Sequence, residues 1–347
     1  MNRLTFLGAV NSYTGYGLHG IRIVRDLERL AGVRVNIRAL NTSEAFGAKI
    51  PTDIRERIAL APQPEPWELL LHPPNFYPTP GKKTAYFTMW ETTSLPHGGA
   101  LSLNQASVII VPCEFNAVAF SAGGVTAPIR IVNLGVDESI FRFSPVRLDH
   151  SRPITTVFGA AGRMAHGGVR KGINEVIDVF QKTFVNGENV QLRIKCFPDC
   201  NVSEVSDPRV SITKKYLSDE EMGKWMREIH CFVSMARGEG WGLLQHQAMA
   251  VGRPVISVAF GGVREFLNQS NALVVSHRLE PAQHSYAQCG LWAVPDPGSV
   301  AMAMTWVHDN LSSALRVGEI ASTTVSNFTW SRHSSSLVSV LNEFGAL

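Results

Sequence analysis

The stretch from Cys231 to Glu265, CFVSMARGEGWGLLQHQAMAVGRPVISVAFGGVRE, decides the fold of this 347-residue chain. It begins with CFVSM, an apolar run typical of a short strand, and continues into ARGEGWG, whose three glycines exclude regular structure. LLQHQAMAV then predicts a helix that ends at Gly252, because glycine suits the left-handed helix-ending position and Pro254 bars continuation. PVISV predicts a second strand. This order is that of a β–α–β unit in a parallel sheet.

The loop before this helix is a candidate ligand site. Open parallel sheets bind ligands at the carboxyl ends of their strands, and the free amides and dipole of a helix start suit an anion such as phosphate. Gly238, Gly240 and Gly242 let the backbone approach a ligand closely. Glu239 is the only acid in the loop, and a carboxylate suits sugar hydroxyls better than phosphate. The alternative is a plain strand–helix turn with a surface glutamate.

The same stretch resembles the donor-binding signature of retaining glycosyltransferases of family 4. That signature has a Glu, seven residues, a second Glu, a helix end of small residues, Gly-x-Pro-Val-Ile and Gly-Gly-x-x-Glu. Glu239 matches the first Glu, and Gln247 stands where the second Glu is usual. The remaining matches are Gly252, Pro254, Gly261, Gly262 and Glu265.

The resemblance implies the GT-B fold, in which two Rossmann-like α/β domains face a cleft and a C-terminal helix crosses back to the first domain. It spans nearly the whole chain and is strongest at 154–265. We expect an acceptor-side domain over 1–150, a nucleotide-sugar-binding domain over 151–327 and the returning helix over 328–347.

The pattern along the chain agrees with two such domains. RLTFLGAV, NSYTGYG and an amphipathic stretch over about 18–30 predict a strand, a glycine-containing loop and a helix. ITTVFGAA, GRMAHGGVRKG and INEVIDVFQKTF repeat that order in the second half. Ser218 and Glu221 form a capping-box pair at the start of the helix that leads into CFVSM. A final helix is expected over 328–344, with Ser331 as its N-cap.

The loop GRMAHGGVRKG is a second anion signal, because Arg163, Arg170 and Lys171 stand ahead of a helix start. In the resembled family an Arg and a Lys grip the donor diphosphate, and Arg163 and Lys171 match them. The loop is slightly longer than usual, which leaves Arg170 open as an alternative to Lys171. A solvent-exposed basic loop is the other interpretation.

The resemblance also implies that Gln247 faces the ribose of the donor. A glutamine keeps an acceptor oxygen but loses the charge of the usual glutamate. The alternative is a helix residue whose amide only satisfies a nearby backbone group. The loop residues expected to help Glu239 hold the donor are Gly240, Trp241, Gly242 and Leu243.

The first domain offers fewer candidates. Gly15 and Gly17 follow the first strand, and the resemblance implies contact with donor phosphate or acceptor; a tight turn is the equal alternative. Glu91 stands at the carboxyl end of the strand TAYFTMW, where many family members carry a His, and it is a candidate for holding a sugar or acceptor hydroxyl. Further candidates, each more often structural, are His19, His72 and His97.

These residues predict a hexosyltransferase that moves a sugar from a nucleotide diphosphate-sugar to an acceptor hydroxyl. Arg163 and Lys171 would neutralise the charge on the leaving diphosphate while Glu239 orients the sugar. The resemblance implies retention, with the leaving phosphate accepting the acceptor's proton. Two cations and helix-start amides can replace a divalent ion, so we expect neither a metal nor a cofactor besides the donor.

The acceptor class is open. A net charge of +3 and a pI of about 8.6 are only mildly basic, so acidic partners are permitted without being demanded. A DNA-base glycosyltransferase of the same fold is not favoured, because the sequence shows no strong basic stripe. A glycan, lipid-linked or small-molecule acceptor is favoured over DNA. A sugar-nucleotide-binding protein that has lost transfer is the third possibility, opposed by the presence of Arg163, Lys171 and Glu239.

The chain has the features of a soluble, cytoplasmic protein. Its five cysteines are odd in number and scattered, which favours reduced thiols, and it shows neither a signal peptide nor a run of 18 apolar residues. A peripheral membrane contact is conceivable through a basic segment, although a solvated helix face is the favoured interpretation. That segment contains Arg22, Arg25, Arg29, Arg34 and Arg38.

Overall fold

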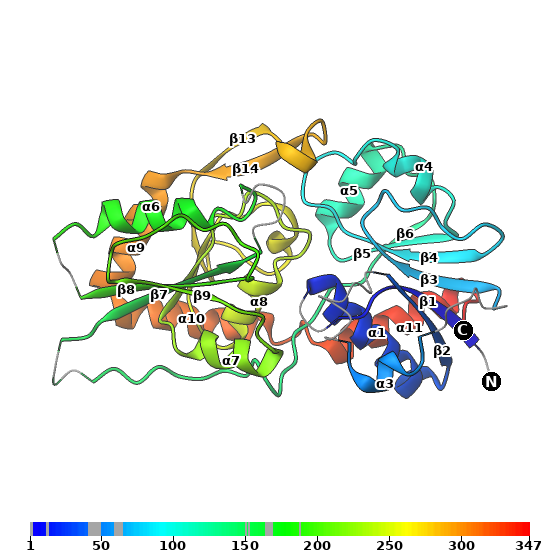
Figure 1. Ribbon diagram of the computed structural model, residues 1–347, viewed down its shortest axis with the longest axis horizontal. Coiled ribbons are helices and arrows are strands. Elements are labelled where there is room, and N and C mark those ends of the chain that lie inside the picture. The colour runs from blue at the N-terminus through cyan, green and yellow to red at the C-terminus, as the bar shows by residue number, and fades with distance from the viewer. Residues whose placement is uncertain are drawn as a thin grey trace. The chain divides into compact units, whose positions relative to one another are not determined.

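The protein is described by a computed structural model that covers residues 3–11, 14–40, 50–58, 65–149, 151, 153–163, 169–186 and 189–347. Its contacts divide into two compact units, of which unit 1 is Met1–Gly135 with Phe328–Leu347 and unit 2 is Val136–Asn327. Each unit is a six-stranded sheet with helices packed against it (Figure 1). The expected pair of Rossmann-like α/β domains is confirmed.

Unit 1 is built on an all-parallel sheet of order β2-β1-β3-β4-β5-β6. The apolar strands β3 and β5, with the sequences WELLL and VIIV, are buried along their whole length, as expected of strands covered on both faces. The strands are β1 (Arg3–Ala9), β2 (Arg34–Leu40), β3 (Trp67–Leu71), β4 (Lys83–Phe87), β5 (Val108–Val111) and β6 (Ile129–Ile131).

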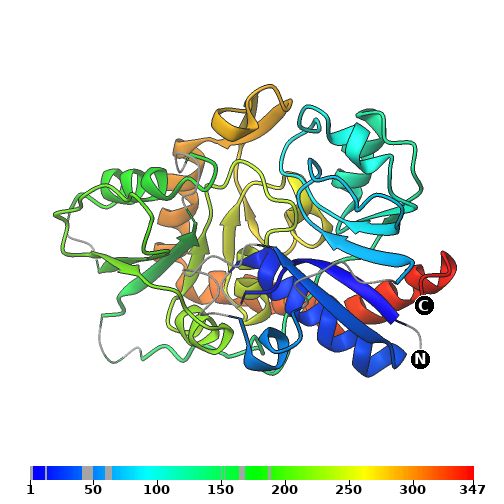
Figure 2. The same cartoon turned by 45° about the vertical axis from the view of Figure 1, so that its right-hand side comes forward.

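Helices cover both faces of this sheet. Figures 1 and 2 show α4 and α5 on one face and α1 with α11 on the other. The helices are α1 (Gly15–Ala31), α3 (Thr52–Arg55), α4 (Gly99–Leu103), α5 (Glu114–Ala122) and α11 (Trp330–Glu343).

Two helices begin at residues that differ from the predicted ones, and a side-chain cap explains each difference. Helix α1 begins at Gly15, ahead of the expected start near residue 18, because the Thr14 hydroxyl accepts a hydrogen bond from the Gly17 amide at 3.0 Å. The prediction of Ser331 as the N-cap of the last helix is wrong. Thr329 caps α11 instead, and its hydroxyl accepts from the Arg332 amide at 3.2 Å.

The returning C-terminal helix belongs to unit 1, as expected. Helix α11 packs against α1, and the Ser334 hydroxyl donates to Asp26 Oδ2 at 2.6 Å. Beside this contact the Nε2 atoms of His19 and His333 lie 3.0 Å apart in the buried interior. Polar groups of both helices therefore pair inside the core, which fixes the register of the last helix on the first.

Unit 2 repeats the architecture with an all-parallel sheet of order β12-β11-β10-β7-β8-β9. The predicted β–α–β unit is present as β10, α8 and β11. The strands are β7 (Thr156–Gly162), β8 (Val190–Cys196), β9 (Val210–Lys214), β10 (Cys231–Val233), β11 (Val255–Ser257) and β12 (Leu273–Val274). The sequence did not predict β9, which is a half-exposed edge strand.

The helices of unit 2 follow their local signals. Ser218 and Glu221 make the predicted capping box at the start of α7, and Gly252 adopts a φ of 80° just after α8. The helices are α6 (Ile173–Thr183), α7 (Asp219–Arg227), α8 (Leu243–Ala250), α9 (Pro297–Asp309) and α10 (Leu311–Val325), with short 3-10 turns η1 (Gly261–Glu265) and η2 (His284–Tyr286). Helix α10 was not predicted.

A hairpin and the cysteines complete the description. Strands β13 (His277–Pro281) and β14 (Leu291–Pro295) pair antiparallel, where the sequence indicated only a strand and a loop. All five cysteines are free and buried. Within the described ranges, none of the helices has both the length and the apolar character needed to cross a membrane.

Candidate functional site

The candidate site lies in unit 2 between the end of β10 and the start of α8. Glu239 belongs to this connection, and its side chain is only 12% exposed. Lys171 Nζ lies 2.5 Å from its Oε1, and Arg170 Nη1 lies 3.3 Å from its Oε2. Arg170 and Lys171, the two alternatives for the predicted diphosphate contact, thus both lie against the same carboxylate.

The two cations decide the charge state of Glu239. Burial by itself would raise the pKa of this carboxyl, but the charges and hydrogen bonds of Lys171 and Arg170 outweigh it and hold the pKa below the ordinary value. Glu239 is therefore an anion at neutral pH. Two cations on one carboxylate leave the cluster with a net positive charge, which suits an anionic ligand.

The Gly-Gly turn of η1 packs against the backbone of the loop that carries Glu239. The Gly262 amide donates to the Glu239 carbonyl at 2.8 Å. A Cβ atom added to Gly262 would lie 2.2 Å from the Gly240 carbonyl oxygen, so only glycine permits this approach. The matched Gly-Gly pair of the sequence motif thus positions the Glu239 backbone.

The loop ahead of α6 and the Glu239 loop are joined through backbone groups. Arg170 Nη1 also donates to the Gly238 carbonyl at 2.8 Å, and the Arg170 carbonyl accepts from the Arg237 amide at 2.8 Å. The aliphatic stem of Lys171 packs beside Gly162 at the end of β7, 3.2 Å from an added Cβ there. The intervening residues 164–168 of the predicted glycine-rich loop lie outside the described residues.

Arg163, the other predicted diphosphate contact, has different partners. Its guanidinium lies 3.4 Å from Asp199 and 5.6 Å from the centre of the Phe197 ring, and its side chain is 39% exposed. It follows directly on β7, whose last residue, Gly162, packs against Lys171. Arg163 therefore follows the strand that packs against Lys171, but its ion pair is with Asp199 and not with Glu239.

The sequence missed a supporting element, the β13–β14 hairpin. Arg170 lies over the ring of Tyr286 at 5.7 Å, and Arg237 lies over Trp292 at 5.3 Å. The Ala293 amide donates to the Arg237 carbonyl at 2.8 Å. The hairpin thus braces the loop that carries Glu239. The two aromatic residues of this segment were the signal available in the sequence.

Helix α8 begins without a capping side chain. Its N-cap is Gly242, at a φ of 93°, and no described side chain accepts from the first-turn amides. Trp241, one residue earlier, buries its ring in the core, where Nε1 donates to His246 Nδ1 at 3.2 Å. Only backbone groups of Gly240, Trp241, Gly242 and Leu243 can therefore serve the predicted donor contact, together with the positive end of the helix dipole.

Gln245 and Gln247 of α8 differ in their hydrogen bonding. The neighbouring Gln245 donates to the Ser234 hydroxyl at 3.0 Å, but Gln247 Oε1 is buried and accepts no hydrogen bond from any described group. The Gln247 residue is only 5% exposed. Polar side chains of α8 are therefore buried together with its apolar ones.

In unit 1 the predicted residues lie near the carboxyl ends of β1 and β4. Gly17 is required by packing, because an added Cβ would lie 2.1 Å from the Asn11 carbonyl oxygen, whereas a Cβ on the exposed Gly15 would meet nothing within 4 Å. Both glycines lie in the first turn of α1 instead of a loop. Tyr16 between them donates to the Met89 carbonyl at 3.3 Å, which brings this turn beside the segment that carries the half-buried Glu91.

The three histidine candidates differ in how far they are buried. His19 is 1% exposed and pairs with His333 in the core, so it is a structural residue. His72 is half-buried, and its Nδ1 lies 3.2 Å from the Pro73 carbonyl. His97 is exposed.

The basic segment of unit 1 is largely neutralised. Arg25 pairs with Asp53 at 2.8 Å, and Arg29 pairs with Asp26 at 3.2 Å.

Across the residues that the structure describes, three or more His, Cys, Asp or Glu side chains nowhere gather in a way that could hold a metal ion.

Part of unit 2 matches a recognised family model. Residues 155–292 match the family model described as glycosyl transferases group 1, and this range contains Arg163, Lys171, Glu239 and Gln247. No curated protein matches the sequence.

Solved structures match the chain over its whole length. Sucrose-phosphate synthase from Thermosynechococcus elongatus has a TM-score of 0.72 at 15% identity, with 100% of each chain covered. HepE from Anabaena, in complex with UDP and glucose, has a TM-score of 0.66 at 13% identity over 99% of this chain and 100% of that chain. The α,α-trehalose 6-phosphate synthase from Burkholderia multivorans gives 0.66 at 11% identity over 100% and 99%. The chain thus has the GT-B fold, and its second unit carries the group 1 glycosyltransferase match.

Proposed function

We propose that the protein transfers a sugar from a nucleoside diphosphate sugar to an acceptor hydroxyl. The observation that carries this proposal is the cluster of Lys171 and Arg170 on Glu239, beside the uncapped start of α8. It combines Lys171, which we propose as a cation for the diphosphate, with a carboxylate for sugar hydroxyls. The family match at 155–292 and the GT-B fold support the same activity.

The donor diphosphate would bind Lys171 and Arg163, with the α8 amides completing the anion site. Lys171 would then pass from Glu239 to the leaving phosphate, and Glu239 would turn to the hydroxyls of the sugar. Charge that develops on the diphosphate as the bond to the anomeric carbon breaks is stabilised by fixed cations and dipoles. Metal-independent catalysis is part of this proposal, since the cations take the role of a divalent ion.

The proposed stereochemistry is retention. The bond between the anomeric carbon and the phosphate oxygen breaks, and the acceptor oxygen bonds to that carbon on the same face. The acceptor's proton passes to the leaving phosphate oxygen, so no side-chain base is required. Glu91 in unit 1 would hold an acceptor or sugar hydroxyl, and the exposed Gly15 would leave room for a ligand at the start of α1.

A donor screen tests the function. The protein would be incubated with UDP-, GDP- and ADP-sugars, with glycan, lipid-linked and small-molecule acceptors, in chelator and in magnesium or manganese. The UDP complex of HepE makes UDP-glucose the first donor to try. We expect release of nucleoside diphosphate with one donor class, undiminished by the chelator. Tight binding of a donor without turnover of any would identify a sugar-nucleotide-binding protein, and activity restored only by a divalent ion would contradict the role of the cations.

The Glu239→Gln variant tests whether Glu239 contacts the sugar or the nucleotide of the donor. We expect transfer to be lost, because the neutral amide makes weaker hydrogen bonds to sugar hydroxyls than the carboxylate does. Affinity for free nucleoside diphosphate should be kept or increased, since Lys171 and Arg170 are released from their internal counter-ion. Calorimetry with free nucleoside diphosphate measures this. A loss of nucleotide affinity that parallels the loss of transfer would place Glu239 at the nucleotide instead.

Gln247 is the proposed ribose contact. Its buried Oε1 lacks a donor among the described groups, and an unsatisfied buried acceptor costs about 1–3 kcal/mol. A ribose hydroxyl would supply the missing hydrogen bond. The alternative was a helix residue whose amide only satisfies a nearby backbone group. The contacts of this oxygen do not support that alternative.

Two substitutions at Gln247 test this contact. Gln247→Ala is expected to weaken nucleotide binding by about 0.5–1.5 kcal/mol, the net contribution of an ordinary hydrogen bond. Gln247→Glu should bind as well as the wild type or better, since it provides a charged acceptor. Calorimetry and melting temperatures measured in parallel check both results. Unchanged affinity in the alanine variant would remove Gln247 from the ribose, and distinctly weaker binding by the glutamate variant at unchanged stability would indicate a site built around a neutral amide.

A further inference from the structure

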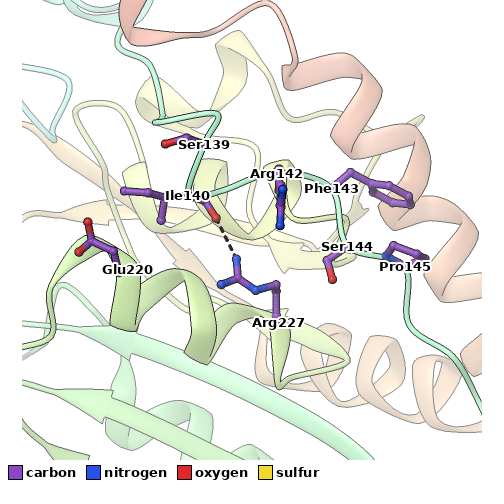
Figure 3. A pocket seen from close by; sticks show the side chains of 8 residues that line it. All are labelled: Ser139, Ile140, Arg142, Phe143, Ser144, Pro145, Glu220 and Arg227. Atoms are coloured by element: carbon purple, nitrogen blue, oxygen red, sulfur yellow. Dashed lines mark hydrogen bonds between the residues drawn. The ribbon is translucent and has the colours of Figure 1, made fainter.

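Unit 2 contains a concave site that none of the proposed donor-binding residues line. It is a hollow of about 690 Å³ between the segment that follows Val136 and helix α7 (Figure 3). This volume is within the range of small-molecule sites. The lining residues are Ser139, Ile140, Arg142, Phe143, Ser144, Pro145, Glu220 and Arg227.

Three arginines without carboxylate partners surround this hollow. Arg142 and Arg227 line it, and Arg253 lies behind it, where its guanidinium donates to the Ser144 carbonyl at 2.8 Å and to the Arg227 carbonyl at 3.0 Å. Within the described ranges, none of the three arginines forms an ion pair. Arg227 also donates to the Ile140 carbonyl at 2.8 Å, as the dashed line in Figure 3 shows.

Half-buried arginines elsewhere in unit 2 have acidic partners. Arg209 and Arg237, which are buried to a similar degree as Arg227, pair with Asp207 and Glu175. Arg253 is only 1% exposed, yet neutral carbonyls are its hydrogen-bond partners. A buried charge without a counter-ion is costly, and burial together with the neighbouring Arg227 lowers the pKa of Arg253 to about 10. An anion in the hollow would relieve this excess of positive charge.

The polar groups of the hollow are ordered along α7. Glu220 lies in its first turn and Arg227 at its last residue, which separates them by about 10 Å at 1.5 Å per residue. An anion is therefore favoured at the Arg142 and Arg227 end, and hydroxyl groups are favoured near the Glu220 carboxylate. Phe143 is 45% exposed and offers an apolar face between these ends.

We propose that this hollow binds a phosphorylated small polyol, such as a sugar phosphate, with its phosphate on Arg142 and Arg227. A bare phosphate ion would fill only a small part of the volume and would not reach Glu220 or Phe143. Arg253 connects the site to the rest of unit 2, since it also donates to the Val251 carbonyl at the end of α8. The proposal is independent of the donor site, because the two sites share no residue.

Calorimetry with glucose 6-phosphate as the probe tests this site, with glucose and inorganic phosphate as comparison ligands. The titrations would be run in excess UDP, so that a nucleotide-binding donor site is occupied. We expect one equivalent of glucose 6-phosphate to bind, more tightly than inorganic phosphate, and glucose not to bind. Equal affinities for glucose 6-phosphate and inorganic phosphate would contradict the polyol contact.

A matched pair of variants assigns the binding to the hollow. Arg142 is exposed and makes no hydrogen bond in the described structure, so Arg142→Gln should leave the fold intact. We expect it to weaken glucose 6-phosphate binding about tenfold, the effect of one charge-assisted contact. Arg147→Gln removes an exposed arginine of the same segment that does not line the hollow, and it should bind like the wild type. Equal effects of the two variants, or binding that UDP abolishes, would overturn the proposal.

Discussion

The Lys171→Ala variant is expected to turn over a nucleoside diphosphate sugar about 30- to 1000-fold more slowly than the wild type. Lys171 would provide a cation to the leaving diphosphate, and the loss of one such group costs about 2–4 kcal/mol of transition-state stabilisation. The group is well placed for this role, because its side chain is only 15% exposed and its Nζ lies 2.5 Å from Glu239. Arg163→Ala should act in the same direction.

A matched lysine controls for the loss of a charge. Lys182, in the last turn of α6, is 75% exposed and pairs with Asp178 on the same helix. Lys182→Ala removes the same charge from the same unit and should leave turnover unchanged. If Lys171→Ala and Lys182→Ala have equal activity, Lys171 does not contact the leaving group.

Stability must be separated from catalysis in this comparison. Lys171→Ala leaves the half-buried Glu239 with only Arg170 of its two cations, so some loss of melting temperature is expected. The double variant Lys171→Ala with Glu239→Gln removes that unbalanced carboxylate and should recover the stability. Turnover should stay low in the double variant, because the cation for the diphosphate is still missing. Recovery of turnover together with stability would show that the single variant failed through its fold.

The sequence predicted those elements whose signals are local. The β10–α8–β11 unit was predicted correctly because Gly252 and Pro254 mark its turn, and α7 because Ser218 and Glu221 form its capping box. Helix α10 was missed because it follows α9 with only Asn310 between the two helices, and neither Gly nor Pro marks the boundary. A change of direction without a breaking residue is decided by packing, which composition does not reveal.

The parts of the site that depend on distant contacts could not be predicted. The sequence proposed Lys171 and Glu239 as separate ligands of the donor, whereas the structure shows that they neutralise one another. The support of Arg170 by Tyr286 joins residues far apart in the chain, and a hairpin turn with a positive φ at His284 carries no propensity signal. Gln247 was recognised from its position in a motif, but its lack of a hydrogen-bond donor follows only from the neighbours that the fold places around it.

Neutral histidines that are buried or half-buried are expected to make the fold sensitive to acid. His230 Nδ1 accepts a hydrogen bond from the Val157 amide at 3.0 Å, and His246 Nδ1 accepts from the Trp241 indole at 3.2 Å. Both bonds need an unprotonated Nδ1. Burial lowers the pKa of His246 to about 3, and burial together with nearby arginines lowers that of His230 to about 4. In unit 1, burial is also the main cause that lowers the pKa of His333 to about 4.

The sign of the pH dependence follows from proton uptake. Since the folded-state pKa values lie below the ordinary value of about 6.5, the unfolded chain binds more protons than the folded one between pH 6.5 and about 4. Stability is therefore fully present above pH 6.5 and falls as the pH drops through this window. Each such histidine contributes a loss of about 1.4 kcal/mol per pH unit, or about 2 kcal/mol at pH 5.

Urea unfolding at pH 7.5, 6 and 5 measures this loss, and one substitution isolates a single histidine. In His230→Asn the side-chain oxygen can replace Nδ1 as the acceptor for the Val157 amide, but it does not titrate. The variant should therefore lose about 2 kcal/mol less than the wild type between pH 7.5 and 5. His97→Gln, at an exposed position, should follow the wild-type profile. If His230→Asn and the wild type lose equal stability over this range, the His230 ring is already protonated in the folded protein, and the hydrogen bond from Val157 cannot be as the structure describes it.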